Sequence, residues 1–529
     1  MIYWLVFLIV SFFYILFKER INEYSYGIRA KKHGCTPPFF LASFPFGLPA
    51  FIQLTKATRK NAGLDFFIDK YSYQPQKYTV RSQALLNTVT FTIDPENVKT
   101  ILATNFRDYS LGVRHEQLKP LLGSGIFTLS GEGWRHSRAL LRPQFSREQV
   151  SQLKTLNLHV QYLVNKLRSR SESGYFDCQV HFHELTLDTA TEFLCGESTD
   201  SLLDSNRIIE GAQHGVGVTP AEFVEAFNRC LEVLSFRAQA GHLYWLVDNF
   251  KFRKNTQICK TFIDHFVCKA LNSPTGLKGG SHIAEHERYI FINELVKETR
   301  DPIAIRDQCF NILLAGRDTT ASLLSFALYW LAKEKRVWNK LREAVLAEYG
   351  TDASSLTFEN LKRCQYLQFV INEVLRLNPA VPINFRVAVR DTILPRGGGQ
   401  YESEPIFVPK GTVVFYSIHV MQRLEKFWGF DSKQFRPERW LDDTLHTWDF
   451  LPFNGGPRIC LGQQFALTEA SFTLVRILQE FKDVELDPRR AQDPQLHQTL
   501  KLTTNVGDGV PIRLISDEKT DNKCMEGTR

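Results

Sequence analysis

A single cysteine in a glycine-rich loop is the strongest chemical signal in this sequence. Cys460 lies in the segment Phe453–Gly462, which reads FNGGPRICLG, directly before an apolar helical run over 465–474. Glycines let backbone N–H groups approach a sulfur closely, and these groups stabilise the charge of a thiolate. No CxxC partner accompanies this cysteine, which argues against a zinc or iron–sulfur site. We therefore predict that Cys460 is a single axial thiolate, the arrangement suited to haem iron.

An acid and two hydroxyls interrupt a long apolar stretch. Asp301 and Pro302 are helix-start signals and predict a helix that runs to about Lys335. In its middle, residues 315–320 read AGRDTT. Glycine weakens a helix, and a threonine hydroxyl can divert a backbone carbonyl. We expect a kink or groove here at a functional site, although an ion pair of Asp318 with a neighbour such as Arg317 would be the plainer interpretation.

A third pattern is the pair Glu373 and Arg376, on an apolar-periodic helix predicted to end at Asn378–Pro379. Residues i and i+3 share a helix face, so the two side chains can form an ion pair within one turn. A bare ExxR is common and usually marks a solvated pair. Here the segment FRPERW (435–440), with a further arginine at Arg439, follows later in the chain.

Trp134 and Arg138 are four residues apart and therefore face the same side of a predicted helix. An indole N–H and a guanidinium are suitable partners for carboxylate groups such as the two propionates of haem. His136 lies between them, and we expect it to be an exposed histidine, with no role as a ligand.

These segments together resemble the cytochromes P-450. Residues 453–462 match the haem-binding signature Phe-x-x-Gly-x-Arg-x-Cys-x-Gly at every fixed position, and residues 315–320 match the oxygen-activation motif of the central helix. The resemblance covers about residues 30 to 515. It implies a mostly α fold with small β-sheets, haem b as the cofactor, and Cys460 as the axial ligand of its iron.

The resemblance also implies roles for residues of the central helix. Thr319 would hold dioxygen and a water by hydrogen bonds, and Asp318 would connect this relay to solvent protons. Ala315 and Gly316 would leave room above the iron.

Other residues would hold and tune the haem by the same resemblance. Phe453 would pack by the thiolate and tune the iron through burial. Glu373, Arg376 and Arg439 would support the cysteine loop structurally. The propionates would be bound by Trp134, Arg138, Arg386 and Arg458.

The N-terminus has the composition of a membrane anchor. Residues 1–17 carry no charge and would span about 25 Å as a helix, the short end of a membrane span. A cleaved signal peptide would need a basic segment before the apolar run and a small-residue cleavage site after it, and neither is present. Basic residues outnumber acidic ones over 18–32, which places the rest of the chain on the cytoplasmic side.

We divide the chain into four parts. They are a transmembrane signal-anchor (1–17), a basic and proline-rich linker (18–38), a P-450 catalytic domain (39–515) and a polar tail (516–529). Outside the motifs, we expect mixed strands and helices over 60–130, mostly helix over 131–380, strands over 381–415 with a loop at 397–399, and a β-like segment over 500–514. Residues 200–290 are the least readable.

Several longer segments resemble the fungal microsomal n-alkane and fatty-acid hydroxylases, which oxidise terminal carbons. They are Gly125–Trp134, Arg142–Phe145, Arg306–Gln308, Asn311–Thr320 and Asn384–Gly399. This implies a single-pass protein of the endoplasmic reticulum membrane with an apolar substrate. Electrons from NADPH would arrive through NADPH–cytochrome P-450 reductase, with cytochrome b5 as a second candidate donor. Arg135 and Arg142 are candidates for the basic face that receives the reductase.

Three other functions stay open at this point. A P-450 monooxygenase could instead act on a fungal secondary metabolite or an aromatic xenobiotic. A haem-thiolate protein could rearrange peroxides without a reductase, although such proteins typically lose the acid–threonine pair that is intact here. A non-catalytic haem sensor is the third. The net charge of +7 is modest, and no basic tract with interleaved aromatics or Walker loop indicates nucleic-acid or nucleotide binding.

Overall fold

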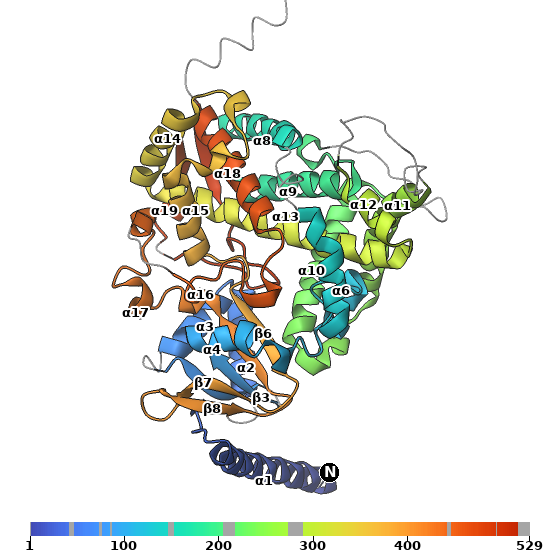
Figure 1. Cartoon of the computed structure of the whole chain (residues 1–529), viewed down its shortest axis with the longest axis vertical. Coiled ribbons are helices and arrows are strands. Elements are labelled where there is room, and N and C mark those ends of the chain that lie inside the picture. Colours follow the sequence, from blue (N-terminus) through green and yellow to red (C-terminus); the bar gives the residue numbers. More distant parts are fainter. Residues whose placement is uncertain are drawn as a thin grey trace, which may run out of the picture.

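The computed structural model describes residues 2–41, 47–72, 77–84, 87–145, 153–204, 217–272, 289–441, 446–493 and 495–516. A helical body fills one half of the molecule, a smaller β-rich part lies beside it, and the N-terminal helix lies across the far end of the β-rich part (Figure 1). This arrangement confirms the predicted class of mostly α with small sheets.

The longer helices are α1 (Ile2–Lys32), α2 (Leu48–Arg59), α3 (Gly63–Ser72), α5 (Arg114–Leu122), α6 (Gly131–Leu141), α8 (Leu153–Glu172), α9 (Cys178–Cys195), α10 (Pro220–Gln239), α11 (Phe250–Asn272), α12 (Phe291–Glu298), α13 (Pro302–Lys333), α14 (Lys335–Tyr349), α15 (Gln365–Leu377) and α18 (Gln463–Glu480). Short helices are α4 (Pro95–Lys99), α16 (Ile418–Met421), α17 (Glu425–Trp428) and α19 (Pro488–Ala491). The strands are β1 (Phe39–Leu41), β2 (Thr79–Ala84), β3 (Asn87–Thr92), β4 (Tyr109–Ser110), β5 (Phe176–Asp177), β6 (Ile383–Ala388), β7 (Thr392–Gly398), β8 (Glu404–Val408), β9 (Val413–Ser417), β10 (Phe481–Leu486) and β11 (Pro511–Ser516).

Helix α13 crosses the centre of the helical body (Figure 1). Its start follows the predicted signals, because the Asp301 carboxylate accepts a hydrogen bond from the Ile303 N–H at 2.9 Å and Pro302 occupies the first turn. It ends at Lys333, two residues before the expected Lys335. Almost every side chain after Asp307 is buried against α9, α15 and α18, which explains its apolar sequence on all sides.

The strands form three sheets. The largest has the order β1-β2-β3-β9-β6-β4, and smaller ones have the orders β10-β11-β5 and β7-β8. Phe91 of β3 stacks on Phe415 of β9 at 5.0 Å between ring centroids, which joins the N-terminal hairpin to the strands that follow α15. The sheet therefore brings β6, with Arg386, beside the helical body.

Two expectations for the β-structure were wrong in part. Gly397 and Gly398 end strand β7 and do not form a loop. Glycine is needed at position 398 because the Thr36 carbonyl lies only 2.7 Å from where a Cβ would stand. Over 500–514, the only strand is the start of β11, while the preceding residues form turns.

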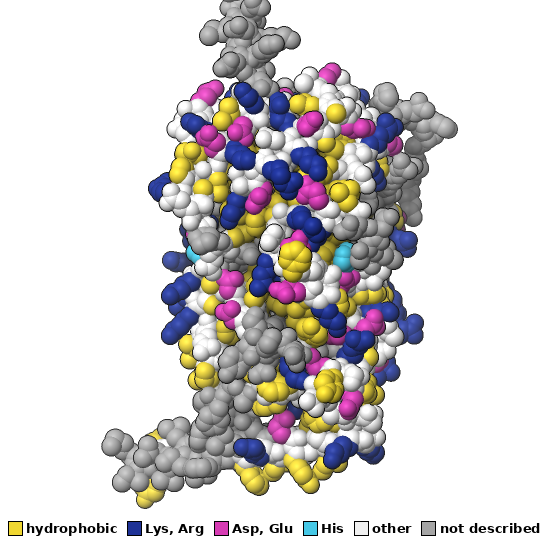
Figure 2. Space-filling model, turned by 90° about the vertical axis from the view of Figure 1, so that its left-hand side faces the viewer, with side chains coloured by type: hydrophobic (Ala, Val, Ile, Leu, Met, Phe, Trp, Pro, Cys, Tyr) yellow, Lys and Arg dark blue, Asp and Glu magenta, His cyan; other side chains and the backbone are white. Residues whose placement is uncertain are grey.

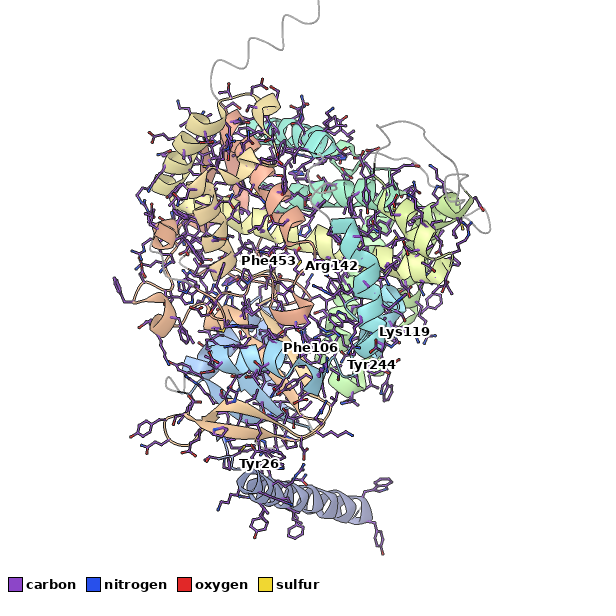
Figure 3. The ribbon with its side chains drawn as sticks, viewed as in Figure 1. Tyr26, Phe106, Lys119, Arg142, Tyr244 and Phe453 are labelled. Carbon is purple, nitrogen blue, oxygen red and sulfur yellow. The ribbon has the colours of Figure 1, made fainter. Side chains whose placement is uncertain are left out.

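Helix α1 contacts the β-rich part through its C-terminal half. Tyr26 is buried, donates its hydroxyl to the Phe407 carbonyl at 3.0 Å and lies under the Arg81 guanidinium at 3.6 Å (Figure 3). Glu23 pairs with the same Arg81 at 2.7 Å. The predicted anchor over 1–17 rests mainly on the side chains of residues 5–16, which lie outside those the structure describes. In the described part of the chain, no helix is long and apolar enough to cross a membrane.

The poorly readable region contains α10 and α11, joined through a 3₁₀ segment, η5 (Gly241–Val247). Residues 205–216 and 273–288 in this region, and 517–529 in the predicted tail, lie outside the described part. On the face drawn in Figure 2, basic and acidic side chains are interspersed, in agreement with a modest net charge that is spread over the chain.

Candidate active site

A cavity of about 270 Å³ lies between α13, α6, β6 and the cysteine loop. Its wall contains Cys460 on one side, and Ala315, Gly316 and Thr319 of α13. Most other lining side chains are apolar. The described lining includes four arginines and no aspartate or glutamate: Arg114, Arg138, Arg386 and Arg458.

The cysteine loop has a backbone that only glycine can supply at one position. Gly456 has φ +66°, and a Cβ there would come within 2.0 Å of the Leu102 carbonyl oxygen. This close approach fixes the turn η10 (Gly456–Arg458) against the neighbouring chain. The Cys460 N–H then donates to the Phe453 carbonyl at 3.0 Å, which closes the loop around the predicted ligand. Phe453 lies near the middle of the molecule, close to Arg142 in this view (Figure 3).

The Cys460 side chain is accessible from the cavity, but protein atoms surround the cavity on most sides, so the thiol is enclosed within the protein. Burial within the protein raises the pKa of the Cys460 thiol, while a hydrogen bond from the Gly462 N–H and the nearby Arg138 charge act in the opposite direction. The N–H directed at sulfur is the feature expected from the glycine-rich sequence. It stabilises a thiolate, the form that binds a metal.

Two of the predicted propionate-binding arginines stack on one tryptophan. Arg458 lies 4.4 Å and Arg138 5.9 Å from the buried Trp134 ring, and Arg138 also donates to the Ile459 carbonyl at 2.9 Å. His136 on the same helix is exposed, as expected. The spacing of Trp134 and Arg138 therefore places both on the cavity side of α6, next to the cysteine loop.

The sequence reasoning missed one arginine of this cluster. Arg114, at the start of α5, donates to the Asn384 side chain at 2.7 Å and stacks on Phe385 at 4.4 Å. Burial, and then the charge of Arg386, lower the pKa of Arg114 to about 9. No local pattern in the sequence marks this arginine, because only the fold brings α5 beside β6.

The four arginines lack counter-charges. None of them has a carboxylate partner among the described residues. Burial, and then the positive charge of Arg386, lower the pKa of Arg458 to about 9. Among the described residues, the buried Nε of Arg386 has no hydrogen-bond partner. Buried cations without acids are costly, so the cluster fits a ligand that brings its own negative charge.

Two hydroxyls bond to carbonyls of helix α13 where it lines the cavity. The Thr319 hydroxyl donates to the Ala315 carbonyl at 2.6 Å, and the Thr186 hydroxyl of α9 donates to the Arg317 carbonyl at 2.8 Å. Helix α13 is continuous through this segment, so the hydroxyls share these carbonyls with the helix, and the kink or groove expected from residues 315–320 stays a prediction. A Cβ added at Gly316 would meet only Ala190 at 3.9 Å, so the backbone here is not crowded.

Asp318 does not line the Cys460 cavity. It faces a second, polar cavity of about 760 Å³ on another side of α13. Its carboxylate accepts from Arg317 at 3.0 Å, so the plainer interpretation of an ion pair with a neighbour is geometrically real. The pair stands at the cavity wall, however, so the ion pair and access to solvent coexist.

A buried charge network joins α15 to the segment 431–440. Glu373 and Arg376 are both fully buried, and their side chains pair at 2.9 Å within one turn of α15. Arg439 reaches the same carboxylate at 2.9 Å and also pairs with Asp431 at 3.1 Å. The Trp440 indole N–H donates to Glu373 at 3.1 Å. The predicted network is therefore present and includes Asp431 in addition.

The residues present fit a haem. Cys460 would ligate the iron, the apolar wall would enclose the macrocycle, and the four arginines with Trp134 would hold the two propionates. The nine cysteines in the described ranges are free thiols, and in those ranges no group of three or more His, Cys, Asp or Glu side chains is placed to hold a metal ion.

Comparison with known proteins agrees with this site. The cytochrome P450 family model matches residues 44–509. The protein named cytochrome P450 52-E3 from Starmerella bombicola is 50% identical over 522 residues, which is 96% of this chain and 97% of the relative. Cytochrome P450 52A12 from Debaryomyces hansenii is 48% identical over 474 residues (87% and 90%), and cytochrome P450 52A3-A from Candida maltosa is 43% identical over 501 residues (93% and 93%).

Family members are monooxygenases that use haem iron and electrons from NADPH, delivered by a redox partner, to oxidise hydrophobic substrates. The family match spans most of the chain and includes the cavity, the thiol and the central helix. This chain therefore belongs to the cytochrome P450 family and is a haem-dependent monooxygenase.

Proposed function

We propose that this protein hydroxylates the terminal carbon of long-chain alkanes or fatty acids. The observation that carries the proposal is the cavity of about 270 Å³, in which one accessible thiol and four arginines without counter-charges are combined with an otherwise apolar wall. The segments that resemble fungal alkane and fatty-acid hydroxylases support the substrate class. The relatives, whose names share the number 52, agree with that resemblance.

Positioning decides which carbon reacts. Terminal C–H bonds are stronger than internal ones, so oxidation at the end of a chain requires a channel that presents only the terminal methyl group. Ile126 and Ile312 line the cavity wall and, with Val381, are suitable for narrowing it around a methylene chain. The haem supplies oxygen activation when bound, and the protein supplies orientation and electrostatics.

The proton supply is assigned to α13. Thr319, in the cavity wall, would hold dioxygen and a water molecule by hydrogen bonds, and Asp318 would pass protons to that water from the polar cavity. Ala315 and Gly316 would leave room beside the reacting oxygen. Cys460 as the iron ligand, Phe453 beside it, and Trp134, Arg138, Arg386 and Arg458 as propionate partners complete the proposed roles, with Arg114 added to the last group.

The redox partner and the membrane arrangement belong to the same proposal. Residues 1–17 would anchor the protein in the endoplasmic reticulum membrane as a single span, with the 39–515 domain on the cytoplasmic side. NADPH–cytochrome P450 reductase would deliver electrons, with cytochrome b5 as a second donor. Arg135 and Arg142 are both exposed on or directly after α6, which supports this face as the docking side.

The test is turnover in reductase-containing microsomes with dodecane and lauric acid assayed side by side by mass spectrometry. Terminal hydroxylation of either substrate is expected and would distinguish alkane from fatty-acid preference. A thiolate-type carbon monoxide spectrum without product from either would contradict the substrate class while leaving the monooxygenase assignment in place.

A further inference from the structure

We propose that His183 of α9 is a positioning residue for proton delivery, because it lies beside Asp318 in the wall of the second cavity and holds the water that connects this carboxylate to solvent. This inference rests on the proposed role of Asp318 and Thr319 in the monooxygenase reaction. It adds to that role a residue from another helix and a route from solvent.

The second cavity has the chemistry of a water-filled space. It measures about 760 Å³ and is lined by ten or more polar and charged side chains, contributed by α9, α10, α13 and the C-terminal segment. They include His183, Arg317, Asp318, Lys501 and Asn505. A polar cavity of this size has ample room and partners for ordered water, whereas the Cys460 cavity is mostly apolar.

One face of α9 is placed against the segment 316–318 of α13. His183, Thr186 and Ala190 follow the i, i+3, i+7 spacing of a single helix face. Ala190 lies opposite Gly316, and Thr186 holds the Arg317 carbonyl at 2.8 Å. His183 comes next along this face and meets Asp318. The same face of α9 therefore lies against both Gly316 and Asp318.

The distance between the two side chains indicates water between them. His183 Nδ1 lies 3.9 Å from Asp318 Oδ1, too far for a direct hydrogen bond, and this nitrogen is buried without a hydrogen-bond partner among the described residues. A buried polar atom that lacks a protein partner is commonly satisfied by an ordered water, and the two side chains, 21% and 10% exposed, lie at the cavity wall. A separation beyond 3.5 Å between two polar groups is the geometry in which a bridging water is expected.

The imidazole stays neutral in this position. Burial, and then the positive charge of Arg317, lower the pKa of His183 to about 4, against the opposing charge of Asp318. Asn505 and Lys501 face it from the C-terminal segment, and Glu184 lines the same cavity from α9. A neutral imidazole can donate to or accept from water without competing with Arg317 for the Asp318 charge.

The reaction consumes protons, and Asp318 with His183 would serve to supply them. Each turnover takes one dioxygen, two electrons and two protons, puts one oxygen atom into the substrate and releases the other as water. Asp318 gives a proton to the Thr319 water and regains one from the cavity water that His183 orients. His183 itself undergoes no net change, so its removal should slow proton delivery without removing the acid.

The test compares two apolar variants, His183→Phe and His183→Leu, with the conservative His183→Gln. The matched control is His181→Gln on the same helix, because His181 is buried, pairs with Glu184 at 2.8 Å and does not contact Asp318. Carbon monoxide spectra establish folding and haem content. The readouts are peroxide released per NADPH consumed and the solvent deuterium isotope effect on NADPH consumption.

We expect coupled turnover to fall roughly tenfold in the apolar variants, below the range typical for loss of a general acid or base. Peroxide yield and the isotope effect should rise, and His183→Gln should restore part of the coupling. Wild-type coupling and isotope effect in a folded His183→Phe or His183→Leu variant would overturn the proposal. Peroxide release per NADPH consumed is measured with any ligand that stimulates NADPH consumption by the wild-type protein. If the wild-type protein hydroxylates neither dodecane nor laurate, that result contradicts the proposed substrate class and leaves the test of His183 unaffected.

Discussion

Helix α13 separates two cavities of opposite character. The Cys460 cavity is about 270 Å³, mainly apolar, and carries positive charge only, whereas the second cavity is about 760 Å³ and carries charges of both signs. Thr319 lines the first cavity, and Asp318, the residue before it in the chain, lines the second. Two adjacent residues of α13 therefore connect an apolar cavity suited to haem and hydrocarbon with a polar cavity suited to proton supply.

The difference shows why polar groups are placed in the middle of an apolar helix. An oxygen-activating site must exclude bulk water and still receive protons. Helix α13 is continuous here, and its Ala315 and Arg317 carbonyls each accept a further hydrogen bond from a threonine hydroxyl. The hydroxyl on the Arg317 carbonyl comes from Thr186, so α9 is joined to α13 at the segment that separates the two cavities.

Removing the thiol should have the largest effect on the apolar side. We expect Cys460→Ser to abolish the thiolate-type carbon monoxide difference spectrum and all turnover, because no other described cysteine lines that cavity. The spectrum of reduced protein in carbon monoxide is the measurement. An unchanged spectrum would remove the assignment of Cys460.

Breaking the buried charge network around Glu373 should have the next largest effect. Glu373→Gln leaves Arg376 and Arg439 buried without their shared carboxylate, so we expect about 3–5 kcal/mol of destabilisation and loss of haem content. Haem per protein and the denaturation midpoint measure it.

The matched control is Glu438→Gln, which removes a partly exposed carboxylate that pairs with Arg336 and Lys340 beside the same network. Solvent-screened ion pairs contribute about 0–1 kcal/mol, so this variant should retain haem. Equal haem loss in both variants would show that the segment as a whole, rather than the buried charge, supports the loop.

The sequence was sufficient where the signals are local. The cysteine loop, the start of α13 at Asp301, the Glu373–Arg376 pair and the Trp134–Arg138 face all depend on residues within a few positions of one another. Capping, i,i+3 and i,i+4 geometry and glycine conformation decide these features, so a single sequence shows them. Arg439 was found because its segment resembles one known from the family.

The remaining features depend on contacts between distant segments. Arg114 and His183 gain their surroundings from β6 and α13, and nothing near them in the sequence indicates this. Gly398 looked like a loop residue because its close neighbour, Thr36, is far away in the chain. The second cavity is likewise assembled from elements that are far apart in the sequence. Periodicity and spacing carry no information about such tertiary pairings.

A second carboxyl group beside α13 allows a comparison between a carboxyl buried without a cationic partner and one at the wall of the polar cavity. Glu469 of α18 is 3% exposed, accepts from the Thr189 hydroxyl at 2.5 Å and faces Thr320, with no arginine or lysine partner in the described residues. Burial raises the pKa of Glu469 to about 7. Asp318, by contrast, pairs with Arg317 at the wall of the polar cavity.

We expect Glu469→Gln to remove a pH dependence of stability. The folded protein holds the Glu469 proton more tightly than the unfolded chain, so its stabilising contribution is full below pH about 4.5 and is lost as pH rises through about 7. The lost contribution is at most about 3 kcal/mol. Denaturant midpoints at pH 5 and pH 8 measure it: the variant should gain stability relative to wild type at pH 8. If the denaturant midpoints of the two proteins changed identically with pH, the result would contradict a buried, protonated Glu469 carboxyl.

The smallest expected effect comes from the hydroxyl at the boundary between the two cavities. Thr319→Ala should lower coupled product formation about tenfold, equivalent to about 1.4 kcal/mol, with a matching rise in peroxide per NADPH consumed. Thr319→Ser keeps the hydroxyl and is the control that should retain most of the coupling.

The double variant Thr319→Ala with His183→Phe then decides whether the two cavities serve one route. Groups that act in series in one route are non-additive, so the double variant should lose little more coupling than the worse single variant. Full additivity of the two losses would mean that protons reach the Cys460 cavity by a path that does not pass through Asp318. In that case the second cavity would be a structural hollow behind α13, and the contrast between the two cavities would not reflect the chemistry of the reaction.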